Sequence, residues 1–146
     1  MIEQTFAVAL TIPDNEAFTA REAIRRLGLA VGEVKRADIW IFEVDEAHAA
    51  GLAAVVATLE TIFNPNKHRL EERAAAAPLP GEVWIAPRDE SRATTVAGRS
   101  LPGVQAIRHA TAWRLVDENG RDVAPAVLDR AVDEFLCNPA FQKARR

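Results

Sequence analysis

An internal repeat constrains this chain more than any other feature of its sequence. Sliding the 146-residue chain over itself by 73 to 74 residues aligns its two halves, with a one-residue shift in the middle. The match includes the scarce residue tryptophan, since Trp40 falls on Trp113, and the Asn-Pro pairs that begin at Asn64 and Asn138. The other identical pairs are Pro13 and Pro87, Glu16 and Glu90, Ala23 and Ala97, Arg25 and Arg99, Leu27 and Leu101, Val31 and Val104, and Ala37 and Ala110. The sequence therefore predicts a duplicated structural unit.

The first half has the pattern of a strand, a helix, a strand-rich segment and a second helix. Its first apolar, partly alternating segment is typical of a strand, and Pro13 stops it. Thr19 and Glu22 have the spacing of a capping box, and Gly28 is a natural helix end. The predicted elements are a strand over 5–12, a helix that starts at the capping box, a hairpin or one bent strand over 34–44, and a long amphipathic helix over 47–63.

The second half repeats this order with weaker signals. Thr94, Thr95 and Gly98 are poor helix formers, so the helix that corresponds to the first one is expected to be weak. Asn119-Gly120 favours a tight turn after the long strand. The predicted elements are a strand over 82–86 that ends at Pro87, a helix over 91–99, a strand-rich segment over 103–116, a turn over 117–120 and an amphipathic helix from Pro125.

These patterns predict an α+β fold. We expect one copy over 1–77, a linker over 78–81 and a second copy over 82–146. Each copy is a β-α-β(β)-α unit, and the second ends too soon after Pro139 for a full closing strand. Units of about 70 residues bury too little apolar surface to be stable alone, so the two copies should pack together. The predicted fold is a pair of ferredoxin-like units that form a pseudo-dimer in one chain.

Composition excludes several classes of function. The net charge is −3, and neither half is basic, so we expect no binding to nucleic acid or to an anionic membrane surface. No apolar run is long enough to cross a membrane, and the first residues do not resemble a signal peptide. The single cysteine, Cys137, excludes an intrachain disulfide. These features favour a cytoplasmic protein.

The sequence contains few residues arranged for chemistry. His48, His68 and His109 lie in different predicted elements, without a second His or Cys at metal-ligand spacing. Cys137 lies on or near the apolar face of the last helix, where a buried thiol is the common case. Nucleophile-elbow and phosphate-loop motifs are absent. We therefore expect no catalytic residue, metal or cofactor. The paired Trp40 and Trp113 favour core or inter-copy packing over a base-stacking platform.

The order and wording of several segments resemble the PurS family, the small subunit of phosphoribosylformylglycinamidine synthase in purine biosynthesis. The resemblance covers about 70 residues twice, and so nearly the whole chain. The segments that carry it in the first half are Pro13-Asp14, 23–28, 31–35 and 62–65, and those in the second half are 103–108 and 135–139. The chain departs from the family pattern at Ala37-Asp38, at Ala110-Thr111 and in the segments that follow both Asn-Pro pairs.

The resemblance implies a ferredoxin-like homo-oligomeric protein without an active site of its own. PurS-like subunits bridge a synthetase subunit and a glutaminase subunit so that ammonia passes between them. A tandem copy would supply in one chain the dimer that separate subunits form. The candidate partner-contact residues are Lys35, Arg36, Asn64, Arg108, His109 and Asn138. The same residues also fit local roles, as caps of turns and as solvated strand positions.

Two alternatives stay open. The first is a regulatory module that binds a small ligand in the cleft between two ferredoxin-like units, as ACT-like domains do. The second is a weakly active enzyme of the dimeric α+β barrel type. That enzyme needs a polar residue inside a cavity between sheet and helices, and His109 is the only plausible occupant.

Overall fold

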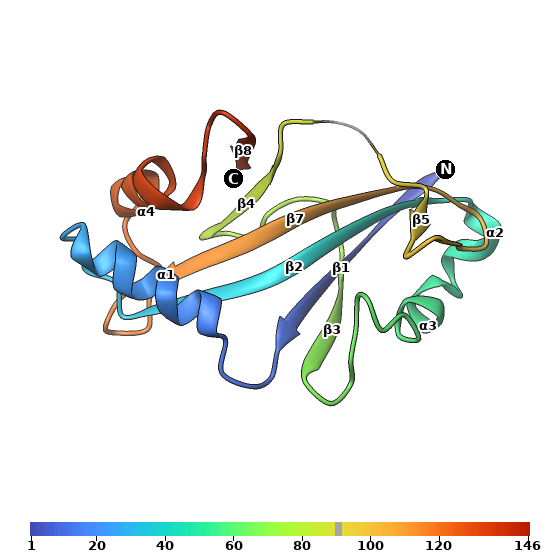
Figure 1. Cartoon of the computed structure of the whole chain (residues 1–146), viewed down its shortest axis with the longest axis horizontal. Helices are drawn as coiled ribbons and strands as arrows, with labels where there is room; N and C mark the ends of the chain where they lie inside the picture. Colours follow the sequence, from blue (N-terminus) through green and yellow to red (C-terminus); the bar gives the residue numbers. More distant parts are fainter. Residues whose placement is uncertain (90–91) are drawn as a thin grey trace. The chain divides into compact units, whose positions relative to one another are not determined.

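The computed structural model describes residues 1–89 and 92–146, which form a mixed α+β fold with mostly antiparallel strand pairing (Figure 1). The strands are β1 (Ile2–Leu10), β2 (Glu33–Val44), β3 (His68–Arg73), β4 (Glu82–Pro87), β5 (Thr95–Val96), β6 (Arg99–Ser100), β7 (Val104–Val116) and β8 (Gln142–Arg145). The helices are α1 (Asn15–Arg26), α2 (Glu46–Ala49), α3 (Leu52–Val56), α4 (Pro125–Ala131) and the π-helical turn η1 (Val132–Leu136). No helix formed by the described residues is long and apolar enough to cross a membrane.

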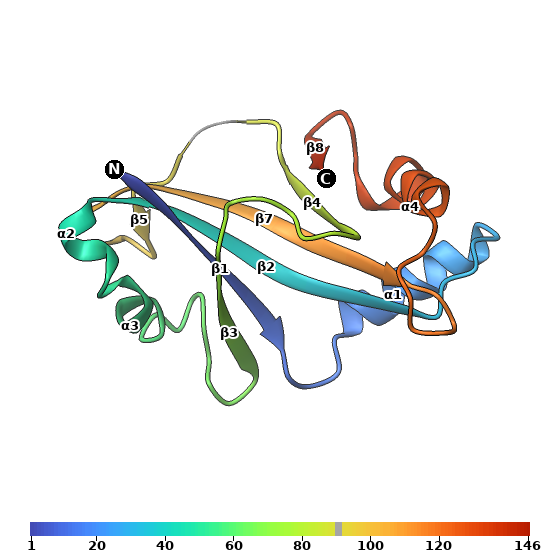
Figure 2. The ribbon, with the colours of Figure 1, turned by 180° about the vertical axis from the view of Figure 1, so that it is seen from behind.

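The chain divides into two compact units, and each takes segments from both halves of the sequence. Unit 1 comprises residues 1–12, 38–76 and, among the described residues, 92–109. Unit 2 comprises 13–37, 77–89 and 110–146. The units therefore cut across the boundaries that the sequence repeat suggests. Each unit contains one part of β2 and one part of β7, and these long strands run side by side in both views (Figures 1 and 2).

Unit 1 contains the strand order β3-β1-β2-β7. Alternate residues of β1 and β2 point into its core, where the rings of Phe6 and Phe42 meet edge to face with centroids 5.8 Å apart. Side chains from α2, α3 and the turns after them complete the core, together with residues from the β5–β6 hairpin and the start of β7. The buried residues from these segments are Ala49, Leu52, Val56, Leu59, Ile62, Val96, Leu101 and Ile107.

Unit 2 contains the strand order β2-β7-β4-β8. Its core lies between these strands and the helical segments α1, α4 and η1. Ile24 of α1, Leu115 of β7 and Val83 of β4 have no exposed surface, and Trp113 packs partly buried against the same cluster. The helices contribute Ala17, Ala20, Leu128, Ala131, Val132 and Leu136.

The two units repeat the same strand register. In unit 1, Phe6 of β1 pairs with Trp40, and in unit 2, Val83 of β4 pairs with Trp113. The outer strands follow the same rule, since Ala7 pairs with Glu71 and its counterpart Trp84 pairs with Arg145. Register fixes which side chains reach the core, because a slip of one residue would turn every side chain to the other face. Both units therefore present equivalent positions of the repeat to equivalent neighbours.

Helix α1 begins earlier than the capping-box prediction. Asp14 is the N-cap, and its Oδ1 atom accepts hydrogen bonds from the backbone N–H groups of Glu16 at 3.0 Å and Ala17 at 3.1 Å. Thr19 lies inside the helix, so the capping box that it forms with Glu22 in the sequence is wrong. An Asp that satisfies two first-turn N–H groups nucleates the helix before that box is reached.

The long helix predicted over 47–63 is also wrong. The structure has the short helices α2 and α3 on either side of Ala50 and Gly51, and then a series of turns. Gly51 is a poor helix former, and beyond α3 the Thr58 hydroxyl donates a 2.6 Å hydrogen bond to the Val55 carbonyl oxygen. The apolar spacing still describes which side chains are buried. Leu52, Val56, Leu59 and Ile62 reach the core through turns instead of one continuous helix.

The helix predicted over 91–99 is replaced by a small hairpin. Ser91 lies outside the described residues, and residues 92–99 contain no helix. Strands β5 and β6 pair in antiparallel fashion around Ala97 and Gly98, whose φ angles are 49° and 79°. Two successive residues with positive φ make a tight hairpin turn, and glycine adopts this conformation without steric cost. The β-branched Thr94 and Thr95 favour the strand before it.

The remaining strands agree with the sequence, except at the end of the chain. Residues 34–44 form one strand, and the predicted turn after β7 is confirmed by a 3.1 Å hydrogen bond from the Gly120 N–H group to the Asp117 carbonyl oxygen. The helix predicted from Pro125 is confirmed as α4 and its continuation η1. The second copy was expected to lack a full closing strand. It has the short strand β8, which pairs with β4 in the way that β3 pairs with β1.

Candidate functional site

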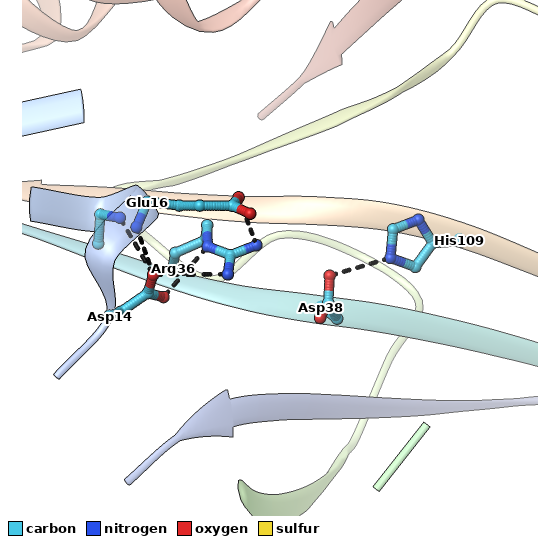
Figure 3. Close-up of polar contacts among 6 residues, drawn as sticks. Asp14, Glu16, Arg36, Asp38 and His109 are labelled. Atoms are coloured by element: carbon cyan, nitrogen blue, oxygen red, sulfur yellow. Dashed lines mark hydrogen bonds and ion pairs between the residues drawn. The ribbon is translucent and has the colours of Figure 1, made fainter. Parts of the chain in front are cut away.

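An ion-paired cluster stands at the start of α1 in unit 2 (Figure 3). Arg36 of β2 donates from Nε to Oδ2 of Asp14 at 3.1 Å, and its second terminal nitrogen lies 3.5 Å from Oδ1. The other terminal nitrogen of Arg36 lies 3.2 Å from Oε2 of Glu16. The side chains of Arg36 and Asp14 are each 16% exposed, whereas that of Glu16 is 73% exposed. The Asp14 carboxylate thus caps the helix and binds the strand at once, which fixes the direction of α1.

An open groove of about 430 Å³ lies next to this cluster, and all of its lining residues belong to unit 2. Helix α1 supplies one wall, Trp113 of β7 comes from the sheet, and η1 supplies the other wall. The lining residues are Asn15, Glu16, Thr19, Ala20, Trp113, Phe135 and Leu136. Apolar side chains with a few polar groups and a volume of this size are typical of small-molecule sites.

The corresponding position in unit 1 is built differently. The Nε2 atom of His109 lies 3.1 Å from Oδ1 of Asp38, and its ring lies over Trp40 with a centroid distance of 4.7 Å (Figure 3). A carboxylate that orients an imidazole is a common arrangement for proton transfer. Here the imidazole and the carboxylate are each 39% exposed, and the ring packs on an apolar side chain. The geometry therefore describes a stacked surface pair.

The sequence repeat relates these two places. At the offset of 73 residues, Arg36 corresponds to His109 and Trp40 corresponds to Trp113. Each unit has a partly buried tryptophan on its core and a nitrogen-rich side chain paired with an aspartate. The aspartates are not equivalent, since Asp14 precedes a helix and Asp38 lies on a strand. The repeat has kept the tryptophan and changed what surrounds it.

The two predicted asparagines form the same turn in each copy. The Asn64 carboxamide oxygen accepts from the Asn66 N–H group at 2.9 Å, and that of Asn138 accepts from the Ala140 N–H group at 3.1 Å. The Asn64 N–H group donates to Nδ1 of His68 at 2.9 Å, and that of Asn138 donates to Oε1 of Gln142 at the same distance. Both asparagines therefore hold the chain as it turns into the closing strand.

The structure does not gather the six predicted contact residues into one site. Lys35 is exposed on β2, and Arg36 belongs to the ion-paired cluster described above. Arg108 forms an ion pair with Glu3 of β1 within unit 1. By compact unit, Arg36 and Asn138 belong to unit 2, whereas Asn64, Arg108 and His109 belong to unit 1.

The groove contains residues that the sequence did not single out as functional. Its acidic and polar residues, Asn15, Glu16 and Thr19, lie on one helix that was expected to begin only at Thr19. The available signal was Asp14, which follows Pro13 and has the side chain of a strong N-cap. Recognising that cap would have placed Glu16 and Arg36 within reach of one another.

Titration and metal binding add little to the site. Within 1–89 and 92–146, no three His, Cys, Asp or Glu side chains gather closely enough to hold a metal ion. The hydrogen bond from His48 holds the pKa of Asp45 below its ordinary value of 3.8. The hydrogen bond to Asp122 raises the pKa of Arg114. Asp45 caps α2 and Arg114 braces a turn, so both shifts belong to structural contacts. Cys137 is partly buried against the core of unit 2.

Comparison with models of known protein families found no match, and comparison with curated proteins found none either.

Proposed function

We propose that this chain is a tandem pair of PurS-like units with a duplicated ferredoxin-like arrangement. Two observations support the duplication. Equivalent residues of the two copies pair in the same register, as Phe6 does with Trp40 and Val83 with Trp113. The closing strands also begin at the same turn, which carries the same hydrogen bonds in both copies.

We further propose a non-catalytic role, as an adaptor that bridges the synthetase and glutaminase subunits of phosphoribosylformylglycinamidine synthase in the cytoplasm. The observation that carries this proposal is the repeated Asn-Pro turn, because these residues carry the resemblance to PurS and adopt one conformation twice. Lys35 and Phe141 are accessible for contact with a partner, and the Phe141 side chain next to the second turn is 72% exposed.

Restoration of activity tests the adaptor role. A synthetase that lacks its small subunit, mixed with its glutaminase, should regain glutamine-dependent activity when the chain is added. Lys35→Glu and Phe141→Ser should weaken that restoration without changing the thermal midpoint of the chain, because both side chains are exposed. Absence of any interaction at micromolar concentration would sink the proposal.

The groove in unit 2 supports a second candidate function, a module that binds a small ligand. Its volume of about 430 Å³ and its mixture of aromatic and polar lining residues suit such a ligand. A thermal-shift screen with amino acids and nucleotides separates the two functions. A large, specific shift in the absence of any protein partner would favour the ligand-binding module.

A further inference from the structure

The groove in unit 2 has the chemistry of a cation site. Its apolar surface includes the indole of Trp113 and the ring of Phe135, which is 45% exposed. Its polar side chains are Asn15, Thr19 and Glu16, and none of the seven lining residues carries a positive charge. Aromatic faces attract cations through the ring quadrupole, and a nearby carboxylate adds to that attraction.

The charges beside the groove favour the same sign of ligand. The cluster of Asp14, Glu16 and Arg36 contains two carboxylates and one guanidinium, which leaves a formal charge of −2 + 1 = −1. The Asp14 carboxylate also accepts two N–H groups of the first turn of α1, so the positive end of this helix is already neutralised. An anionic ligand would meet net negative charge here, whereas a cation is complementary to it.

The molecule already shows both halves of this recognition with its own side chains. The Glu16 carboxylate accepts a guanidinium, that of Arg36, at 3.2 Å. In unit 1, the face of Trp40 is covered by the imidazole of His109 at 4.7 Å, and the equivalent Trp113 lines the open groove instead. A ligand that combines a cationic group with an apolar stem would make both contacts at the second position.

We propose that this groove binds a small organic cation, an alkylammonium or guanidinium group carried on an apolar stem. The charged group lies against the aromatic rings of Trp113 and Phe135 and pairs with Glu16, and the stem packs on Ala20 and Leu136. This inference deepens the second candidate function, the ligand-binding module, and rests on it. It is independent of the adaptor role.

The test uses the full chain and the indole N–H signals of its three tryptophans in nuclear magnetic resonance spectra. The probe is 2-phenylethylammonium, with 2-phenylethanol as its neutral match and 3-phenylpropionate as its anionic match. Single Trp→Phe variants assign the signals. The amine should shift the Trp113 signal in a saturable way below about 10 mM, and both matched probes should bind about tenfold more weakly.

Variants locate the binding. Glu16→Gln should weaken amine binding about tenfold, and Phe135→Leu should weaken it about threefold. Phe18→Leu and Glu22→Gln are controls, since both residues lie on α1 outside the groove lining, and they should leave the affinity unchanged. Unchanged peak dispersion in each spectrum verifies that the variant is folded.

Several results would overturn the proposal. These are equal binding of the alcohol, preferential binding of the carboxylate, a response confined to Trp40 or Trp84, and no saturable shift by any amine. Binding of a lysine-containing peptide without binding of the free amine would overturn the small-molecule assignment. If a neutral or anionic ligand from the wider screen shifts Trp113 instead, the ligand-binding module stands and the cation proposal fails.

Discussion

The surroundings of Trp40 in unit 1 and of Trp113 in unit 2 started from the same sequence pattern and now differ. Trp113 lines an open groove whose wall is the helix α1, held by the Arg36–Asp14 ion pair. In the second copy, the segment that corresponds to α1 is the β5–β6 hairpin, and Trp40 is covered by His109. The registers of the strands beneath both tryptophans are identical.

This difference shows which parts of a duplicated unit are free to change. Strand register and the Asn-Pro turns decide which side chains enter the cores, so altering them would disturb many contacts together. The segment that covers the tryptophan touches fewer neighbours, and local choices such as Thr94, Thr95 and Gly98 convert it from helix to hairpin. Specialisation of one copy for binding is therefore possible within a common frame.

The largest predicted effect tests whether the two cores are equivalent. Phe42 and Leu115 correspond at the 73-residue offset, and both side chains are fully buried. Phe42→Ala should lower the free energy of unfolding by about 3–5 kcal/mol and Leu115→Ala by about 2–5 kcal/mol, because each leaves a cavity. Urea unfolding followed by circular dichroism measures both. The exposed Phe141→Ala serves as control, and a loss below about 1 kcal/mol at either buried site would contradict equivalent cores.

A smaller effect separates the two tryptophan surroundings. Arg36→Ala should cost about 1.5–3 kcal/mol of unfolding free energy, because it removes charge-assisted hydrogen bonds from a mostly buried Asp14. His109→Ala should cost less than about 1 kcal/mol, because its pair with Asp38 is substantially exposed. The same urea experiment compares them. Equal losses would mean that the helix-bearing side is not the more strongly braced one.

The Asn-Pro turns should respond alike. Asn64→Ala and Asn138→Ala each remove one carboxamide oxygen that accepts a backbone N–H group, so each should cost about 0.5–1.5 kcal/mol. Thermal unfolding of the two variants in the same buffer gives the comparison. Matching Asp substitutions, which keep an acceptor oxygen, should recover most of the loss. A large effect in only one copy would show that the turns differ in role.

The smallest effect is a pH dependence confined to unit 1. The pKa of Asp45 lies below 3.8 in the folded chain, chiefly because His48 donates a hydrogen bond to it. Its ionised form therefore favours the folded state above that pH, and this contribution is lost as the pH falls through the lowered pKa. Stability measured between pH 5 and pH 2 should fall less steeply for Asp45→Asn. An unchanged slope would remove Asp45 from the acid response.

Sequence patterns predicted the frame of the molecule better than its covering segments. Alternation located β1, β2, β4 and β7, and the Trp and Asn-Pro matches identified equivalent positions. Periodicity identified Leu59 and Ile62 as buried but could not distinguish one helix from several turns, because both place them on the core. At α1, the later capping box masked the cap at Asp14.

The groove was beyond sequence reasoning for a different reason. Its lining comes from three segments that are far apart in the chain, 15–20, Trp113 and 135–136. Their approach depends on the packing of α1 against η1, which is tertiary. The same holds for the ion pair between Asp14 and Arg36, which are separated by 22 residues. Asp38 and His109, 71 residues apart, meet only because β2 and β7 are neighbours in the sheet.

Sedimentation velocity tests the proposed adaptor role most directly. The chain is mixed at micromolar concentration with a glutaminase and with a synthetase that lacks its small subunit. A PurS-like adaptor predicts a faster-sedimenting species that contains all three proteins, and Lys35→Glu should reduce its amount. Three separate boundaries at the positions of the isolated proteins, unchanged by the presence of the chain, would contradict the account.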